Sequence, residues 1–290
     1  MKYYLGIDAG GTHTRFLMFD EHGNNVERID RDSIHFMRVG FGGIQNVLGE
    51  IKSEFESKGF NFDEVGVAIG TAGYGEDKQV RTKIESAIWN VFPNALIMND
   101  AMFAMTSALN HNDGVYIISG TGSIAFRKHD CVEERRGGFG YLLADEGSAF
   151  WIGKRILEAF TKEADGRLPR TRLYDEIMSH FELQEAYDLI GIANENKEDY
   201  RTWVAQFSGI VGNLESPHVD DVFKRAGLEL AELANNFELN GKTKIAFGGG
   251  VLLHNTRVRE TLLHALNDDY EFVASEHPVE YAAYLLLKQH

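Results

Sequence analysis

The stretch LGIDAGGTHT, Leu5 to Thr14, decides the fold. An apolar strand ends in Asp8, Gly10 and Gly11 follow, and a second strand occupies residues 12–20. Two adjacent glycines let the backbone turn sharply and bring consecutive N–H groups close to an anion. The turn joins two strands, so it is not the strand-to-helix turn of a P-loop. A hairpin that needs glycine only for its geometry is the simpler alternative.

The composition indicates a folded, soluble protein. The chain has 290 residues, of which 43% are hydrophobic, enough to fill the cores of two domains. The net charge of −15 argues against nucleic acid or an anionic membrane surface as a partner. No apolar run approaches the roughly 20 residues of a membrane span, and the N-terminus shows no secretory pattern, so we expect a cytoplasmic protein.

The first part of the chain alternates between strands and helices. Three antiparallel strands are predicted at residues 3–8, 12–20 and 24–32, followed by a helix at 43–58, a strand at 65–70, a helix at 76–92, a strand at 95–99 and a helix from 101. Strands that alternate with helices pair in parallel, so we expect the sheet to continue in that way after the meander.

From Gly114 the order of strand, Gly/Thr turn and strand begins again, which indicates an internal repeat. Strands are predicted at 115–119, 124–130, 131–136 and 243–250, and helices at 146–163, 172–193, 198–213, 218–238 and 255–266. We therefore expect two domains on one plan, residues 1–110 with the C-terminal helix 278–290 and residues 111–277, with a ligand cleft between them.

Two more glycine-rich stretches offer backbone and hydroxyl donors. In ISGTGSIAF the donors are Gly120, Thr121, Gly122 and Ser123, in the same position of the repeat as the first turn. Two such turns indicate a phosphate chain bound from two sides. In AFGGGVLLHN, Gly249 and Gly250 allow close approach to a ring or ribose, although a plain strand-to-helix turn would need glycine as well.

Two carboxylates stand where a buried strand or a glycine run gives way to a helix. Asp100 follows the strand at 95–99, where it can be a helix N-cap or a general base that accepts a proton from an attacking hydroxyl. Asp145 follows Gly137 and Gly138 in GGFGYLLADEGSAFW and is a candidate ligand contact. An acidic first turn is also favourable helix electrostatics, which is the alternative for this segment.

Taken in order, GIDAGGTHTRF, NDA, SGTGS, GGFG, DEGSAFW and AFGGGVLLHN resemble the motifs of the BadF/BadG/BcrA/BcrD ATPase family, and within it those of N-acetylglucosamine kinases. This resemblance implies two RNase H-like (actin-like ATPase) domains, each a mixed sheet flanked by helices, around an interdomain cleft. It also implies transfer of the γ-phosphoryl group of ATP, with Mg²⁺, to the 6-hydroxyl of an amino sugar, and a homodimer.

The resemblance also assigns roles to residues. It makes Asp100 the catalytic base and Asp8 the carboxylate that holds Mg²⁺. The implied sugar contacts are His35, Asp100, Thr121, Gly137, Gly138 and Asp145, and the implied nucleotide contacts are Gly10, Gly11, Thr12, Thr14, Gly120, Thr121, Gly122, Ser123, Gly249 and Gly250. His35 stands where the family usually has Asn, which leaves N-acetylglucosamine, glucosamine, N-acetylmuramic acid and glucose open as acceptors.

Other activities of this broad family remain as alternatives. An ATPase without a sugar acceptor has the same motifs. A sugar-responsive regulator without turnover is a second alternative, but the acidic balance and the absence of an N-terminal helix-turn-helix argue against DNA binding. The iron–sulfur dehydratase activators need more than one cluster cysteine in a chain, whereas this chain has only Cys131.

Overall fold

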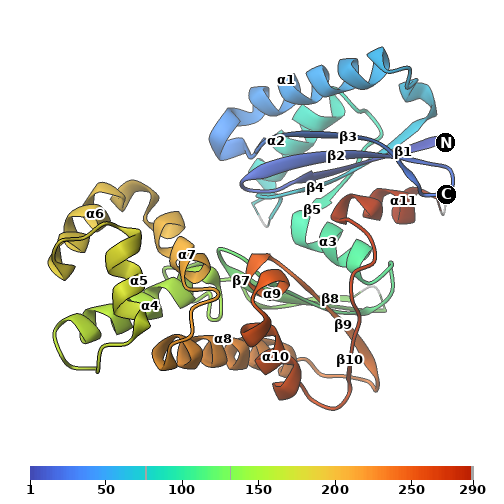
Figure 1. Ribbon diagram of the computed structural model, residues 1–290. Helices are drawn as coiled ribbons and strands as arrows, with labels where there is room; N and C mark the ends of the chain where they lie inside the picture. The colour runs from blue at the N-terminus through green and yellow to red at the C-terminus, as the bar shows by residue number, and fades with distance from the viewer. Residues whose placement is uncertain (76, 131, 289–290) are drawn as a thin grey trace. The chain divides into compact units, whose positions relative to one another are not determined.

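The computed structural model describes residues 1–75, 77–130 and 132–288, so Cys131 lies outside the described residues. The chain divides into two compact units, one formed by Met1–Asn112 with Val273–His290 and the other by Asp113–Phe272. Each unit is built around a five-stranded sheet (Figure 1). The chain therefore leaves the first unit once and returns to it at its C-terminal end.

The sheet of the first unit has the order β3-β2-β1-β4-β5. Its strands are β1 (Tyr3–Ala9), β2 (His13–Asp20), β3 (Asn25–Asp32), β4 (Val65–Thr71) and β5 (Leu96–Asn99). The first three are antiparallel, and β4 and β5 continue in parallel beside β1, as the sequence predicts. The register places Asp8 of β1 directly opposite Arg15 of β2.

Helices cover both faces of this sheet. The elements are α1 (Phe36–Ser57), η1 (Phe62–Glu64), α2 (Lys78–Trp89), α3 (Asp100–Ala108), η4 (Val279–Tyr281) and α11 (Ala282–Leu287). Apolar residues of α1 and α2 pack with one face, and those of α3 and α11 pack with the other. The helix α1 begins before the predicted residue 43, but Gly40 interrupts it with the non-helical angles φ 71° and ψ 172°.

The second unit repeats this plan with the strand order β10-β9-β6-β7-β8. Its strands are β6 (Gly114–Ser119), β7 (Ser123–His129), β8 (Val132–Gly137), β9 (Thr243–Gly248) and β10 (Tyr270–Phe272). β6, β7 and β8 form an antiparallel meander, and β9 and β10 extend the sheet in parallel on the other side of β6. The short strand β10 was not predicted, because three residues carry little periodicity.

The helices of the second unit surround a large apolar core. They are α4 (Ala149–Ala164), α5 (Arg172–His180), η2 (Ala186–Asp188), α6 (Leu189–Glu195), η3 (Lys197–Asp199), α7 (Tyr200–Ile210), α8 (Pro217–Asn235), α9 (Gly250–His254) and α10 (Thr256–Ala265). The prediction of one helix at 172–193 is wrong. Glu182 has a left-handed φ of 51°, and the Asp188 carboxylate accepts the N–H groups of Gln184 and Glu185 in a local turn.

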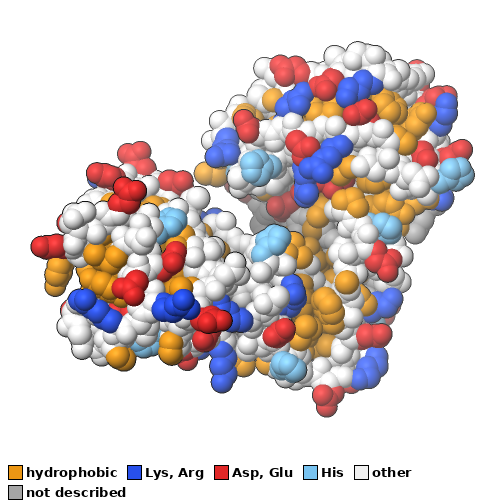
Figure 2. Space-filling view, in the orientation of Figure 1, with side chains coloured by type: hydrophobic (Ala, Val, Ile, Leu, Met, Phe, Trp, Pro, Cys, Tyr) orange, Lys and Arg blue, Asp and Glu red, His pale blue; other side chains and the backbone are white. Residues whose placement is uncertain are grey.

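Charged side chains of both signs are mixed on the face of the molecule that Figure 2 draws. On the face shown in Figure 2, Lys and Arg side chains are scattered among Asp and Glu side chains and do not gather into a basic patch. Among the described residues, no helix has the length and apolar character required to cross a bilayer.

Candidate active-site residues in the two units

The glycine turn of the first unit is a hairpin with an exposed tip. The Gly10 N–H donates to the His13 carbonyl over 3.1 Å, and the Ser33 hydroxyl donates to the Gly10 carbonyl over 2.8 Å. Gly11 and Thr12 are exposed, and a Cβ added at Gly11 would meet nothing within 4 Å. This turn is therefore fixed at Gly10, and the groups open to a ligand are those of Gly11 and Thr12.

Two hydroxyls expected at the phosphates are buried instead. The Thr14 Oγ1 atom is inaccessible and accepts the Ile34 N–H over 3.1 Å. The Ser123 hydroxyl is 4% exposed and donates to the Glu146 carbonyl over 2.7 Å. Both hydroxyls are therefore engaged within the protein, and the nucleotide contacts of Thr14 and Ser123 stay predictions. Each hydroxyl ties a following segment to its glycine turn.

Asp8 is held by an arginine that sequence reasoning assigned no definite role. Arg15 Nη2 lies 2.9 Å from Asp8 Oδ2, and Arg15 Nε lies 3.0 Å from Oε1 of Glu280, whose side chain is fully buried. Burial alone would lower the pKa of Arg15, but the hydrogen bond with Asp8 and the charge of Glu280 outweigh it and raise the pKa. The hairpin register predicts the Asp8 to Arg15 pair, whereas no sequence spacing identifies Glu280.

The carboxylates of this region suit a divalent cation. Asp8 presents a half-buried carboxylate near the end of β1, and its charge acts on both Asp100 and Glu280. Two of these carboxylates, Asp8 and Glu280, pair with Arg15, whereas Asp100 has no ion pair among the described residues. Mg²⁺ prefers oxygen ligands of this kind, usually with several retained waters. The donor set therefore fits the ion that the resemblance implies, with Asp8 as its protein contact.

Asp100 is the first residue of α3, immediately after β5. The N-cap of this helix is Asn99, whose side chain accepts the Ala101 N–H over 3.0 Å. Asp100 Oδ1 also lies 3.0 Å from that N–H, so the cap does not depend on Asp100 alone. Burial raises the pKa of Asp100, and the negative charge of Asp8 raises it further. Asp100 is consequently a stronger base than an ordinary aspartate, as a general base requires.

His35 caps α1 with its ring. Its Nδ1 accepts the Met37 N–H over 3.2 Å, so the neutral ring carries its proton on Nε2. Burial lowers the pKa of His35, and the charge of Arg38 lowers it further. The ring stacks on Phe36, and a Cβ at Gly73 would come within 2.8 Å of Nε2. His35 thus offers a donor, Nε2–H, in a fixed orientation.

The glycine turn of the second unit is anchored on α4. The Gly120 N–H donates to the Gly122 carbonyl over 2.9 Å, and the Ala149 N–H donates to the Gly120 carbonyl over 2.8 Å. The Ser119 hydroxyl is buried and donates to the Gly147 carbonyl. Thr121 is exposed at the tip. As in the first unit, a rigid hairpin presents one reachable threonine.

A cavity of about 580 Å³ lies within the second unit beside this turn. It is lined by Gly120, Thr121 and Gly250, by residues of α7 and by the end of α9. Gly249 lies so close to β6 that a Cβ there would be 2.4 Å from the Ser119 carbonyl carbon, which only glycine allows. The structure thus brings together the second glycine turn and the glycine run at 248–250. A volume of this order suits a nucleoside or similar ligand.

The sequence did not predict that residues of α7 line this cavity. The polar residues of α7 that do so are Thr202, Gln206 and Ser208, and His254 and Asn255 also line the cavity. The pattern of α7 predicts a helix with an apolar stripe but does not indicate which element its polar side faces. That information comes only from the packing of α7 against α4.

Asp145 lies against the glycine turn and not in solvent. It is 3% exposed and has a left-handed φ of 72°, which is strained for a residue other than glycine. Its Oδ1 accepts the Gly140 N–H over 3.2 Å, and a Cβ at Gly122 would be 2.7 Å from Oδ2. Burial raises the pKa of Asp145, although the Arg201 charge opposes the rise.

Arg201 of α7 is a second functional candidate that the sequence did not reveal. Its Nη2 lies 3.5 Å from Asp145 Oδ2, which has no hydrogen-bond partner in the described part of the chain. The same is true of Arg201 Nε. Unsatisfied buried polar atoms on both partners are typical of a site whose remaining partner is a ligand or ordered water.

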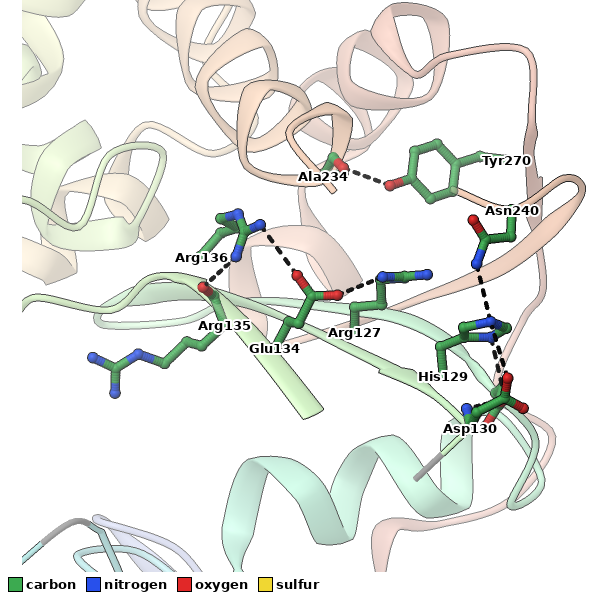
Figure 3. Close-up of polar contacts among 10 residues, drawn as sticks. Arg127, His129, Asp130, Glu134, Arg135, Arg136, Ala234, Asn240 and Tyr270 are labelled. Atoms are coloured by element: carbon green, nitrogen blue, oxygen red, sulfur yellow. Dashed lines mark hydrogen bonds and ion pairs between the residues drawn. The ribbon is translucent and has the colours of Figure 1, made fainter. Parts of the chain in front are cut away.

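The strand β8 ends at two glycines that are predicted to contact the sugar. Gly137 and Gly138 have left-handed φ angles of 69° and 71°, and a Cβ at Gly138 would come within 2.5 Å of Ile124. Figure 3 shows how β8 is fixed before them: the Glu134 carboxylate accepts hydrogen bonds from Arg127 of β7 and from Arg136. This network holds the strand in register, so that the glycine pair leaves the sheet at a defined point.

A polar cluster lies near the end of β7 and the start of β8. Ligand atoms of Asp113, His129 and Asp130 lie within 4.8 Å of one another. The Asp113 carboxylate accepts the Asp130 N–H over 2.9 Å, and His129 Nε2 lies 3.1 Å from the Asn240 amide nitrogen (Figure 3). The exposed cluster thus has protein partners that account for it as the fastening of a turn.

Sequence comparison finds amino-sugar kinases among the relatives of this chain. An N-acetylmuramic acid/N-acetylglucosamine kinase of Clostridium acetobutylicum is 31% identical over 197 residues, which cover 66% of this chain and 63% of that protein. An N-acetyl-D-glucosamine kinase of Dictyostelium discoideum is 29% identical over 221 residues, or 71% of this chain and 69% of the relative. The matched segment thus spans less than two thirds of the length of the first relative.

The fold is shared over the whole chain with a solved structure from Chromobacterium violaceum that is provisionally named an N-acetylglucosamine kinase. It superposes with a TM-score of 0.76 at 20% identity and covers 99% of both chains. This similarity confirms the predicted actin-like α/β fold with two mixed sheets flanked by helices. Residues 5–281 match the model of the BadF/BadG/BcrA/BcrD ATPase family, and the chain belongs to that family.

Proposed function

We propose that this protein is an ATP-dependent amino-sugar kinase that phosphorylates the 6-hydroxyl of N-acetylglucosamine or a closely related sugar. Membership of an ATPase family supports the use of ATP, and the two amino-sugar kinases among the relatives support the acceptor. The observation that carries the proposal is the environment of Asp100. Its carboxylate is half-buried and has a raised pKa, and the helix α3 is capped by Asn99, so Asp100 is not required for that purpose.

The chemistry assigned to Asp100 is general-base catalysis. Its carboxylate accepts the proton of the sugar 6-hydroxyl as that oxygen bonds to the γ-phosphorus, and the bond between the γ-phosphorus and the bridging oxygen breaks to release ADP. Mg²⁺ held at Asp8 would supply positive charge to the phosphate oxygens. Arg15 orients the Asp8 carboxylate from the neighbouring strand.

The second unit supplies the nucleotide site in this proposal. The cavity beside α7 receives the nucleoside, and Gly120, Thr121 and Gly122 donate to phosphate oxygens. In the first unit, Gly11 and Thr12 do the same from the exposed hairpin tip. Gly249 and Gly250 keep the backbone close to the bound ring or ribose.

The side chains proposed to contact the sugar include His35, Asp100 and Asp145. His35 donates through Nε2–H, and Asp100 binds the hydroxyl that it activates. Asp145 binds sugar hydroxyls together with backbone groups at Gly137 and Gly138, whose φ angles are left-handed. A homodimer and a cytoplasmic location remain predictions; light scattering of the purified protein tests the first.

The test is a coupled ADP-release assay across N-acetylglucosamine, glucosamine, N-acetylmuramic acid and glucose, with the phosphate position read by NMR. We expect one or more amino sugars to stimulate ADP release and to yield a 6-phosphate. Steady ATP hydrolysis that no sugar stimulates would favour an ATPase without a sugar acceptor. If neither hydrolysis nor transfer occurs with MgATP, the enzymatic proposal is wrong.

A further inference from the structure

A buried carboxylate from the C-terminal segment reaches the proposed metal site. Glu280 is 0% exposed, and neither of its carboxylate oxygens has a hydrogen-bond partner of good geometry among the described residues. Its charge is met by Arg15, whose Nε lies 3.0 Å from Oε1. A buried carboxylate without a counter-ion costs several kcal/mol, so Glu280 strongly favours keeping Arg15 beside it.

The position of Glu280 is fixed by its backbone. The segment η4 lies over β1 so closely that a Cβ at Gly6 would be 2.0 Å from the Glu280 carbonyl oxygen. On the following residues, Tyr281 and Tyr284 pack edge-on against Phe19 and Tyr4 of the sheet. The backbone of Glu280 is therefore held against β1, and its fully buried side chain has Arg15 as its ion-pair partner.

Arg15 lies between two carboxylates of different exposure. Its Nη2 pairs with Asp8 Oδ2, on a side chain that is 19% exposed, while its Nε pairs with the fully buried Glu280. An ion that binds Asp8 competes with Arg15 for that carboxylate. Because Glu280 remains as a counter-ion, Arg15 can give up part of its interaction with Asp8 without being left unpaired.

We propose that Glu280 is a positioning residue that holds Arg15 in place and so leaves Asp8 available to Mg²⁺. This inference rests on the proposed role of Asp8 as the metal contact. Without the Glu280 charge, Arg15 would have Asp8 as its remaining partner and would compete more strongly with the metal. The region would also lose one of the negative charges that attract a divalent cation. Both effects weaken metal binding.

The experiment is Glu280→Gln, which removes the charge and keeps the side-chain shape. Mn²⁺ is titrated by electron paramagnetic resonance in the presence of a non-hydrolysable ATP analogue, so that the readout does not need turnover. Loss of a partner that orients a metal ligand typically costs about 10- to 100-fold in affinity, and we expect a loss of that size. Glu280→Asp, which retains the charge, should recover part of it.

The matched control is Glu163→Gln. Glu163 is also a fully buried glutamate in an ion pair, with His218 Nδ1 at 2.6 Å, but it lies in the second unit. We expect its Mn²⁺ affinity to equal that of the wild type even if its thermal stability falls. Equal Mn²⁺ affinities for Glu280→Gln and Glu163→Gln would overturn the proposal.

Two further outcomes separate this inference from the proposed function. If the wild-type protein binds the analogue with no dependence on Mn²⁺, the role of Asp8 fails, and the inference fails with it. If Glu280→Gln does not fold, Arg15→Lys tests the same link, because it retains the cation but loses the guanidinium that reaches both carboxylates. Unchanged Mn²⁺ affinity in Arg15→Lys would then contradict the proposal.

Discussion

At the scale of single residues, some side chains stabilise the fold while their neighbours remain available to a ligand. Asn99 caps α3 and thereby relieves Asp100 of that task. Thr12 and Thr121 are exposed at the hairpin tips, while Thr14 and Ser123 are buried and fasten the loops around them. Hydroxyl residues within one motif thus have different roles, which depend on whether each lies at the exposed hairpin tip or within the strand that follows it.

Asp100→Asn tests the catalytic role directly. We expect kcat for sugar phosphorylation to fall by about 100- to 10,000-fold, the usual contribution of a general base, because the amide cannot accept the hydroxyl proton. Binding of a non-hydrolysable ATP analogue, measured by calorimetry, should remain close to that of the wild type. Near-normal turnover would show that Asp100 is only part of the start of α3.

The same variant should be more stable than the wild type at neutral pH. Burial raises the pKa of Asp100 above its ordinary value of 3.8, so the folded state favours the protonated form. The stability that this group contributes is present below its unfolded pKa and is lost as pH rises through the raised folded pKa. Asn is always neutral, so its advantage should shrink as pH falls towards the pKa of Asp100. Thermal melts from pH 7 down to pH 4 measure the difference, and a constant gap would contradict the burial argument.

His35→Asn and His35→Ser form a pair of variants that test sugar recognition. Asn and Ser both serve as N-caps, so α1 should be retained in each. Asn can still reach and donate to a sugar hydroxyl, whereas Ser is too short, so the KM for the sugar should rise more in the Ser variant. Loss of one hydrogen bond of about 1 kcal/mol corresponds to roughly a 5-fold change. Identical KM values for the sugar in all three proteins would remove His35 from the site.

At the scale of elements, the helix α7 contributes both to the apolar core of the second unit and to the lining of its cavity. Its apolar residues Trp203, Val204 and Phe207 are buried, and Thr202 and Gln206 line the cavity. The contact with α4 is close, since a Cβ at Gly153 would lie 1.9 Å from the Val204 carbonyl oxygen. The position of the cavity wall is therefore set by helix packing and not by the glycine motifs.

Gly209→Leu tests whether this cavity binds the nucleotide. Gly209 lines the cavity, and a Cβ there would meet nothing within 4 Å, so Leu fills the space without a clash at its Cβ. We expect the Kd for an ATP analogue to rise about 10-fold or more, because displaced contacts of about 1.4 kcal/mol correspond to that factor. Calorimetry provides the measurement.

Gly191→Leu is the matched control for this experiment. Gly191 lies in α6, also has nothing within 4 Å of an added Cβ, and does not line the cavity. Both substitutions remove a helical glycine and should stabilise the fold by up to about 1 kcal/mol. A change of nucleotide affinity that is equal in the two variants would argue against the cavity as the site.

At the scale of the whole molecule, the C-terminal segment completes the unit in which the chain begins. α11 packs on β1 and β4, and Ala282 and Ala283 are fully buried beside Phe103. The first unit therefore includes residues that follow the whole second unit in the chain. Its apolar core and the ion pair between Arg15 and Glu280 both depend on residues separated by most of the chain length.

Gly6→Ala tests this closure. The added Cβ would lie 2.0 Å from the Glu280 carbonyl oxygen, and a backbone atom cannot yield as a side chain can. Overpacking of this kind costs at least about 1 to 3 kcal/mol, which chemical denaturation would detect, and proteolysis should cut the segment after Phe272 more readily. Gly49→Ala, in α1 with nothing within 4 Å, should instead be neutral or stabilising. Equal stabilities for the two variants would contradict the close contact.

Much of the fold was predictable because its determinants are local. Hydrophobic periodicity and glycine turns predict both antiparallel meanders and most helices, and the similarity of the two halves predicts their common plan. The errors fall where local hydrogen bonds compete with periodicity, as at Asp188, or where an element is as short as β10. The candidate site residues were found by the same local motifs.

The sequence alone therefore determined the type of fold, the positions of the glycine turns and the presence of Asp8 and Asp100 at strand ends, since these depend on residue type and short-range spacing. Only the tertiary structure decided which hydroxyls are buried, that α7 walls the cavity, and that Glu280 holds Arg15. Those features arise from contacts between residues far apart in the chain, and side-chain burial depends on packing that no short stretch of sequence specifies.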